Sequence, residues 1–105
     1  MKLSDIDDRC KKNNIQYAYR KFLSDIDPPH VIGTVIDTDN FGADNIVWHK
    51  STNFRLELTT LKKDLNLEKK IECEILKDVF WNKTESYIPE EEIYNVSYFF
   101  NIEEE

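Results

Sequence analysis

A chain of 105 residues is the common size of one domain, so we expect a single domain over residues 1–105 with one modest core. Its 40% hydrophobic and 33% charged residues are typical of a globular chain and exclude a disordered one. The net charge of −7 disfavours non-specific nucleic-acid binding, because carboxylates repel phosphates. The N-terminus becomes charged at once and no apolar stretch has membrane-spanning length, so we expect synthesis in the cytoplasm and no membrane partner.

The first predicted element is a helix from about residue 5 to residue 13. Ser4 can cap its N-terminus, and the pair Asn13-Asn14 can end it. A short extended segment at residues 17–20 follows, where aromatic residues alternate with others. A proline pair then breaks the chain before the next extended run.

The middle of the chain predicts three strands. Residues 31–36 and 46–48 are rich in β-branched side chains, and residues 54–59 alternate apolar with polar side chains. Residues 37–45 are rich in turn formers, so we expect a loop there. Phe41 is the odd residue in that polar loop.

The last third predicts a helix over residues 65–77, capped by Asp64, an extended segment at residues 80–88 and a final strand at residues 94–102. Strands that come in runs, rather than alternating with helices, favour an antiparallel arrangement. We therefore predict an α+β fold: one mostly antiparallel mixed sheet of about five to six strands, with two helices packed on one face.

Metal binding is not predicted. The segment that starts at Asp37 begins like a calcium loop, with carboxylates two residues apart and a glycine in the sixth place. The loop then fails, because Phe41 occupies the fifth place and Trp48 the twelfth, where oxygen ligands are needed. Cys10 and Cys73 share no metal-type spacing and fall in predicted helices, where a buried thiol acts as a small hydrophobe.

Catalysis is not predicted either, and we expect neither an enzyme nor a cofactor. Gly33 and Gly42 are the only glycines, which excludes phosphate-binding glycine loops and the G-x-S-x-G nucleophile elbow. The two histidines, His30 and His49, lie in no catalytic motif. No pair of the 21 acidic residues stands out for acid–base chemistry.

The aromatic residues are more informative, because they dominate both cores and protein interfaces. They make up 12% of the chain, and most belong to the predicted core. Phe41 and Phe99, which lies opposite the apolar stripe of the last strand, are each either a capping contact or an interface anchor. The candidate protein interface consists of Asp39, Asn40, Phe41, Gly42, Asp44 and Phe99.

Several short words of the sequence cover nearly the whole chain in a recognisable order and spacing. They are Pro28-Pro29, Asn40-Phe41-Gly42-Ala43-Asp44-Asn45, Phe54-Arg55-Leu56-Glu57-Leu58-Thr59, Lys63-Asp64 with Leu67-Glu68, Phe80-Trp81 with Lys83, Glu85 and Tyr87-Ile88, and Glu92 with Tyr94. Together they resemble a family of small tail proteins from the morphogenesis clusters of long-tailed phages and prophages of Gram-positive bacteria. His30 departs from the pattern, because an aromatic or apolar residue is expected after the proline pair.

Members of that family look like tail terminator, tail completion or head–tail joining proteins. The resemblance implies a ring of identical copies, usually a hexamer, that caps the head-proximal end of the tail tube and joins it to the head connector. It implies as partners a second copy, the tail tube protein and a head-completion or connector protein, while DNA passes through the ring without specific binding. Assembly would take place in the host bacterial cytoplasm, and the protein would end at the head–tail junction of the virion.

Within that role, the segment around Phe41 is our candidate for docking onto the tube or connector. A second class of function stays open: a small acidic phage regulator or DNA-mimic inhibitor that masks a basic surface on a host protein. Native mass spectrometry distinguishes the two functions, because a ring-forming protein associates with itself whereas a DNA mimic stays monomeric or dimeric.

Overall fold

The computed structural model describes the backbone of residues 1–43 and 46–104 and the side chains of residues 1–38 and 51–103. The elements follow the order α1 (Leu3–Lys12), β1 (Tyr17–Tyr19), β2 (His30–Ala43), β3 (Ile46–Thr60), α2 (Leu65–Lys70), the π-helical turn η1 (Ile71–Ile75), β4 (Trp81–Ile88) and β5 (Ile93–Glu104). None of the helices in the described part of the chain has the length and apolar character needed to cross a membrane.

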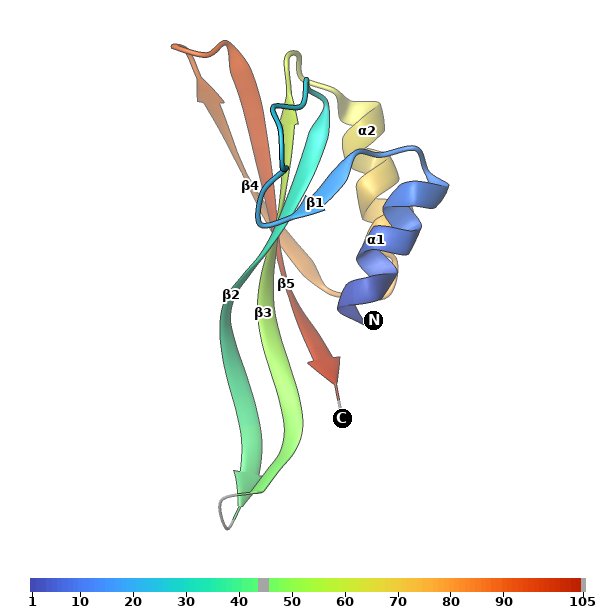
Figure 1. Cartoon of the computed structure of the whole chain (residues 1–105), viewed down its shortest axis with the longest axis vertical. Helices are drawn as coiled ribbons and strands as arrows, with labels where there is room; N and C mark the ends of the chain where they lie inside the picture. Colours follow the sequence, from blue (N-terminus) through green and yellow to red (C-terminus); the bar gives the residue numbers. More distant parts are fainter. Residues whose placement is uncertain (44–45, 105) are drawn as a thin grey trace.

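The five strands form one sheet in the order β1-β2-β3-β5-β4, and both helices cover the same face of it (Figure 1). β1 pairs with β2 in parallel, and the other three strand pairs are antiparallel. The prediction of an α+β fold with one mostly antiparallel mixed sheet and two helices on one face is confirmed.

Helix α1 begins earlier than the sequence suggested. Its N-cap is Lys2 rather than Ser4, and the backbone N–H of Lys2 donates to the carboxylate of Asp5 at 2.8 Å. The predicted end is confirmed: Asn14 adopts a φ of 57°, and the N–H that follows it donates to the carbonyl of Cys10 at 2.9 Å. This is the left-handed C-terminal cap that asparagine tolerates better than most residues.

Helix α2 begins where predicted, since the Asp64 side chain accepts a hydrogen bond from the Leu67 N–H at 3.0 Å. After Lys70 the helix widens into η1, in which the N–H of Leu76 donates to the carbonyl of Ile71 at 2.9 Å. The widened turn keeps the apolar side of this helix buried against the sheet at Ile71, Ile75 and Leu76.

The core lies between the helices and the sheet. It is built from alternate residues of the two central strands, namely Phe54, Leu56 and Leu58 of β3 and Val96, Tyr98, Phe100 and Ile102 of β5, together with Val31 of β2 and Ile6, Cys10, Ile71, Ile75 and Leu76 of the helical segments. The alternation predicted for these two strands is therefore confirmed. Cys10 is buried as expected, whereas Cys73, which we also expected to pack inside, is exposed.

The predicted loop over residues 37–45 was wrong. β2 continues to Ala43 and β3 starts at Ile46, so this segment belongs to one long hairpin. The turn-forming residues do not interrupt the strand, because pairing in an antiparallel ladder uses backbone groups and β propensity depends strongly on context. Residues 44 and 45, and with them the candidate Asp44, lie outside the described part of the chain.

A β-bulge at Ile36 marks the base of this hairpin. Val35 pairs with Phe54 and Asp37 pairs with Asn53, so Ile36 is an extra residue on β2. Without the bulge, Asp37 would face the helices, because it lies two residues after the inward-facing Val35. The bulge instead places Asp37 on the face of the sheet away from the helices.

The hairpin makes the molecule elongated. Its longest principal extent is 51 Å against 28 Å and 27 Å for the other two, and its radius of gyration is 15.0 Å. A compact domain of this length has a radius of gyration of about 13 Å. Figure 1 shows the cause: β2 and β3 run well past the helical layer.

Candidate protein interface

The face of the sheet opposite the helices is mostly polar. Its side chains include Asn53, Arg55 and Glu57 of β3, Asn95, Ser97, Phe99 and Asn101 of β5, and Asn82, Thr84 and Ser86 of β4. No helix of the described chain covers this face (Figure 1). A wet face of this kind is ordinary for an antiparallel sheet, so its few apolar residues are the informative ones.

A groove of about 410 Å³ crosses this open face at the base of the hairpin. Phe99 lies in its lining, Phe80 stands at one end and the bulged Ile36 lies on the far strand. Phe80 is fully exposed (100%), Ile36 is 51% exposed and Phe99 is partly buried. Phe99 therefore lies on the face that its sequence position predicted, and it lines the same groove as Phe80 and Ile36.

A line of polar side chains runs beside these apolar residues. The Nδ2 of Asn53 donates to the Oδ1 of Asp37 at 2.5 Å, and the Nδ2 of Asn101 donates to the Oδ1 of Asn53 at 3.1 Å. Asn101 also contacts the Oγ of Ser51 at 2.5 Å. These bonds cross β2, β3 and β5, so they fasten the base of the hairpin to the rest of the sheet.

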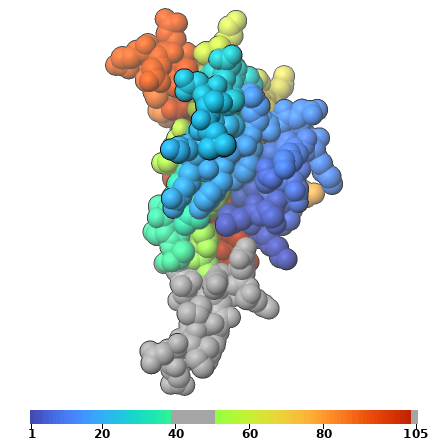
Figure 2. Space-filling view, viewed as in Figure 1, coloured from blue at the N-terminus to red at the C-terminus, as the bar shows by residue number. Residues whose placement is uncertain are grey.

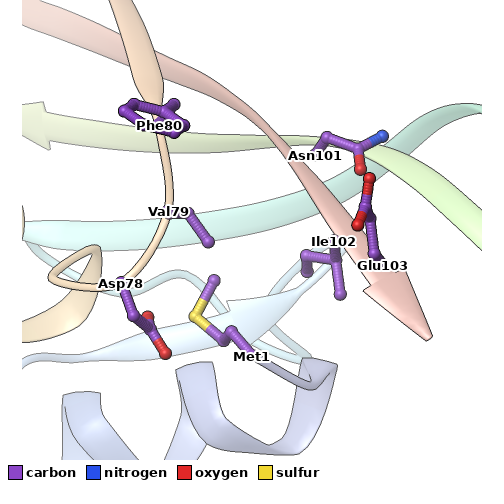
Figure 3. Close-up of a pocket in the computed structure, with 7 residues that line it drawn as sticks. All are labelled: Met1, Asp78, Val79, Phe80, Asn101, Ile102 and Glu103. Carbon is purple, nitrogen blue, oxygen red and sulfur yellow. The ribbon is translucent and has the colours of Figure 1, made fainter.

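Phe80 also borders a second cavity of about 470 Å³, between the start of α1, the segment before β4 and the end of β5 (Figure 3). Asp78 lies at this cavity and accepts two hydrogen bonds from the Arg9 guanidinium, at 2.8 and 3.1 Å. This hydrogen-bonded pair lowers the pKa of the Asp78 carboxyl. Phe80 is therefore the residue directly before β4, and it lines both the groove on the open face and this second cavity.

The outer part of the β2–β3 hairpin is a two-stranded arm. β3 pairs with β5 only from Lys50 to Thr60, and β1 pairs with β2 no further than Gly33. We define the arm as residues 41–43 of β2 and 46–49 of β3, which pair only with each other in the described chain. An isolated two-stranded hairpin is at best marginally stable in water, so an arm of this kind favours a partner.

The predicted interface residues separate into two places. Asp39 and Asn40 lie on β2 at the base of the arm. Phe41 and Gly42 lie on the arm, where the backbone of Phe41 pairs with that of His49. Phe99 pairs with Arg55, which is about 20 Å further along β3 at about 3.4 Å per residue. The structure therefore does not bring Phe41 and Phe99 into one patch.

Phe80 and Ile36 are interface candidates that the sequence reading missed. Both had a signal in the sequence. Phe80 precedes Trp81, and two consecutive aromatic residues in a strand cannot both face the core. Ile36 ends a run of β-branched residues in which alternate positions must point away from the helices.

A charged cluster on the helix side ties β4 to α2. Glu68 is 2% exposed and lies 2.8 Å from the Nζ of Lys63 and 3.2 Å from the Nζ of Lys83. Lys83 also bonds to Glu72 at 2.9 Å, which raises the pKa of the lysine, and the Tyr98 hydroxyl donates to Glu72 at 2.8 Å. The inward-facing charge of β4 is therefore neutralised within the chain.

Comparison with protein-family models and with curated proteins finds no match for this sequence. Among the described residues, no group of three or more histidine, cysteine, aspartate or glutamate side chains is placed to hold a metal ion. The functional argument therefore rests on the arm, the groove and the edges of the sheet.

Proposed function

We propose that this chain is a tail terminator or tail completion protein of a long-tailed phage or prophage. In this role, copies of the chain form a ring at the head-proximal end of the tail tube and join it to the head connector. Assembly takes place in the host bacterial cytoplasm, and the finished ring lies at the head–tail junction of the virion.

The observation that carries the proposal is the arm. Its residues 41–43 and 46–49 extend beyond the body of the molecule and pair only with each other in the described chain (Figure 1). Such a ribbon gains most of its stability from what it docks against. Phe41, Gly42 and Ala43, which belong to a sequence word that resembles the phage tail family, lie on this arm.

The two outer edges of the sheet support a ring as well. One edge is β4 and the other is the part of β2 beyond Gly33, and the two are unlike each other. Contacts between unlike surfaces are head to tail, and they produce a ring when the rotation closes. The net charge of −7 suits a ring through which DNA passes, because carboxylates repel phosphates.

Native mass spectrometry of the chain, alone and mixed with tail tube protein, tests the proposal. We expect a closed ring, with six copies as the leading stoichiometry implied by the family resemblance. Phe41→Ala should impair ring formation or joining of the ring to the tube. A chain that remains monomeric or dimeric in both conditions contradicts a terminator and favours the acidic regulator or DNA mimic.

A further inference from the structure

We propose that the free edge of β4 binds the outer edge of β2 from a second copy, so that the sheet continues from one copy to the next. This inference rests on the proposed ring and names the surfaces that close it. The two edges lie on opposite sides of the sheet within one copy, and the contact joins the β4 edge of one copy to the β2 edge of the next.

The edge of β4 is open to a further strand. β4 has eight residues, and its register with β5 runs without a shift from Trp81↔Phe100 to Ile88↔Ile93. The strand contains no proline and no bulge, which are two of the devices by which proteins block strand addition. Its backbone therefore presents a straight row of donors and acceptors on the outer side.

The side chains of β4 also leave the edge accessible. An inward-pointing charge commonly protects an edge strand, but Lys83 is bound by Glu68 and Glu72, and Glu85 is paired with Lys63. The side chains on the open face, Asn82, Thr84 and Ser86, are small and neutral. An incoming strand therefore meets no uncompensated charge on β4.

The matching edge is on β2. β1 covers residues 31–33 of this strand, and the outer side from residue 34 to residue 43 has no strand beside it in the described chain. The regular part of this edge lies beyond the β-bulge at Ile36 and runs from residue 37 to residue 43. It spans about 24 Å at about 3.4 Å per residue, against about 27 Å for the eight residues of β4. Strand addition would give the two-stranded arm a third strand, which is what a hairpin needs to be stable.

The occupant is a second copy because every copy carries both open edges, one on β4 and one on β2. Pairing of β4 with β4 would produce an isologous dimer and leave both arms unsupported. Pairing of β4 with β2 satisfies both edges of every copy and repeats around a ring. Phe80, fully exposed directly before β4, is placed to anchor this contact as interface aromatic residues do.

Disulfide cross-linking tests which edges meet. In a Cys73→Ser background, a chain carrying Asp37→Cys on the open face of β2, beyond the bulge, and either Asn82→Cys or Ser86→Cys on β4 is oxidised. The first pair meets if the added strand is parallel, and the second meets if it is antiparallel. The native thiol of Cys10 is buried and stays out of the reaction. We expect a ladder of covalent oligomers that ends at the ring, because each copy then carries both halves of the contact. Single-cysteine chains should not form this ladder.

The interpretation depends on a separate measurement of ring formation. A ring seen by native mass spectrometry without a ladder in either double variant overturns the inference and leaves the proposed function standing. A chain that never self-associates, with or without tube protein, contradicts the proposed function and this inference together.

A matched pair of surface variants tests the anchor. Phe80→Asp and Leu23→Asp each replace a fully exposed apolar side chain, 100% and 103% exposed, by the same charge. Leu23 lies between β1 and β2, outside both proposed edges. We expect Phe80→Asp to raise the dissociation constant of self-association by about thirtyfold, and Leu23→Asp to leave it nearly unchanged. Equal effects of the two variants, or no effect of Phe80→Asp, overturn the role of this edge.

Discussion

Gly33→Ala is expected to destabilise the fold, because two rings occupy the space that a side chain would need. Gly33 lies on β2 opposite Leu56, on the helix-facing side of the sheet. A Cβ atom at this position would lie 2.6 Å from the Cζ of Phe54 and 2.6 Å from the Oη of Tyr17. Real Cβ contacts are not this short, so at least one ring must move.

Phe54 has little room to yield. It is fully buried, with its ring 5.5 Å from that of Phe100 and 6.4 Å from that of Tyr19, centroid to centroid. Overpacking of a tight core costs about 1–3 kcal/mol, and two simultaneous clashes favour the upper half of this range. Replacing glycine by alanine also reduces the conformational entropy of the unfolded chain, which stabilises the folded state by about 0.4–1 kcal/mol. The net expectation is a loss of about 1.5–2 kcal/mol of unfolding free energy.

Urea unfolding followed by circular dichroism measures this loss, and the melting temperature should fall by about 10 °C. Tyr17→Phe removes the Oη contact and provides the control. The Gly33→Ala penalty should shrink by about half when it is measured in the Tyr17→Phe background. A penalty below about 0.5 kcal/mol in the native background would refute the close approach of the two rings.

Three further predictions concern burial, charge and the base of the hairpin. Burial raises the pKa of the Cys10 thiol from 9.0 to about 12, so the thiol ionises in the unfolded chain first. The neutral Cys10 thiol therefore contributes its full stabilisation below pH 9, and above pH 9 the free energy of unfolding falls by up to about 1.4 kcal/mol per pH unit. Urea unfolding between pH 8 and 10 should show this decline in the native chain and less of it in Cys10→Ala. Lys63→Ala and Lys83→Ala should each lower the free energy of unfolding by about 1 kcal/mol. The double variant should lower it by about 3 kcal/mol or more, because Glu68 is then buried without a cation. Additive losses in a double-mutant cycle measured by thermal unfolding would contradict this shared pairing. Asn101→Ala should cost about 1 kcal/mol and increase amide hydrogen exchange at residues 37–53, and unchanged exchange would show that this side chain does not hold the hairpin base.

The sequence was informative where local patterns decide the structure. The strict alternation at residues 54–59 and 94–102 reflects one buried face, and it predicted the two central strands of the sheet. Asp64 and Asn14 act through bonds to residues a few positions away, so the start of α2 and the end of α1 could be located. The same alternation placed Phe99 on the open face.

The hairpin arm and the groove could not be predicted in this way. Pairing of Phe41 with His49 depends on backbone hydrogen bonds, which leave no apolar pattern in a polar segment. The groove depends on the bulge at Ile36 and on the order of the strands in the sheet. Phe80, directly before β4, and Phe99 of β5 line it from separate segments of the chain. Figure 2 shows the overall result, a body built from distant parts of the sequence that lie side by side.

The mass of the native assembly tests the central claim most directly. Native mass spectrometry of the unmodified chain with tail tube protein should show a closed ring of identical copies, with dissociation into single chains and no stable dimer as a building block. A monomer or an isologous dimer as the only species, with and without tube protein, would contradict a ring-forming tail terminator.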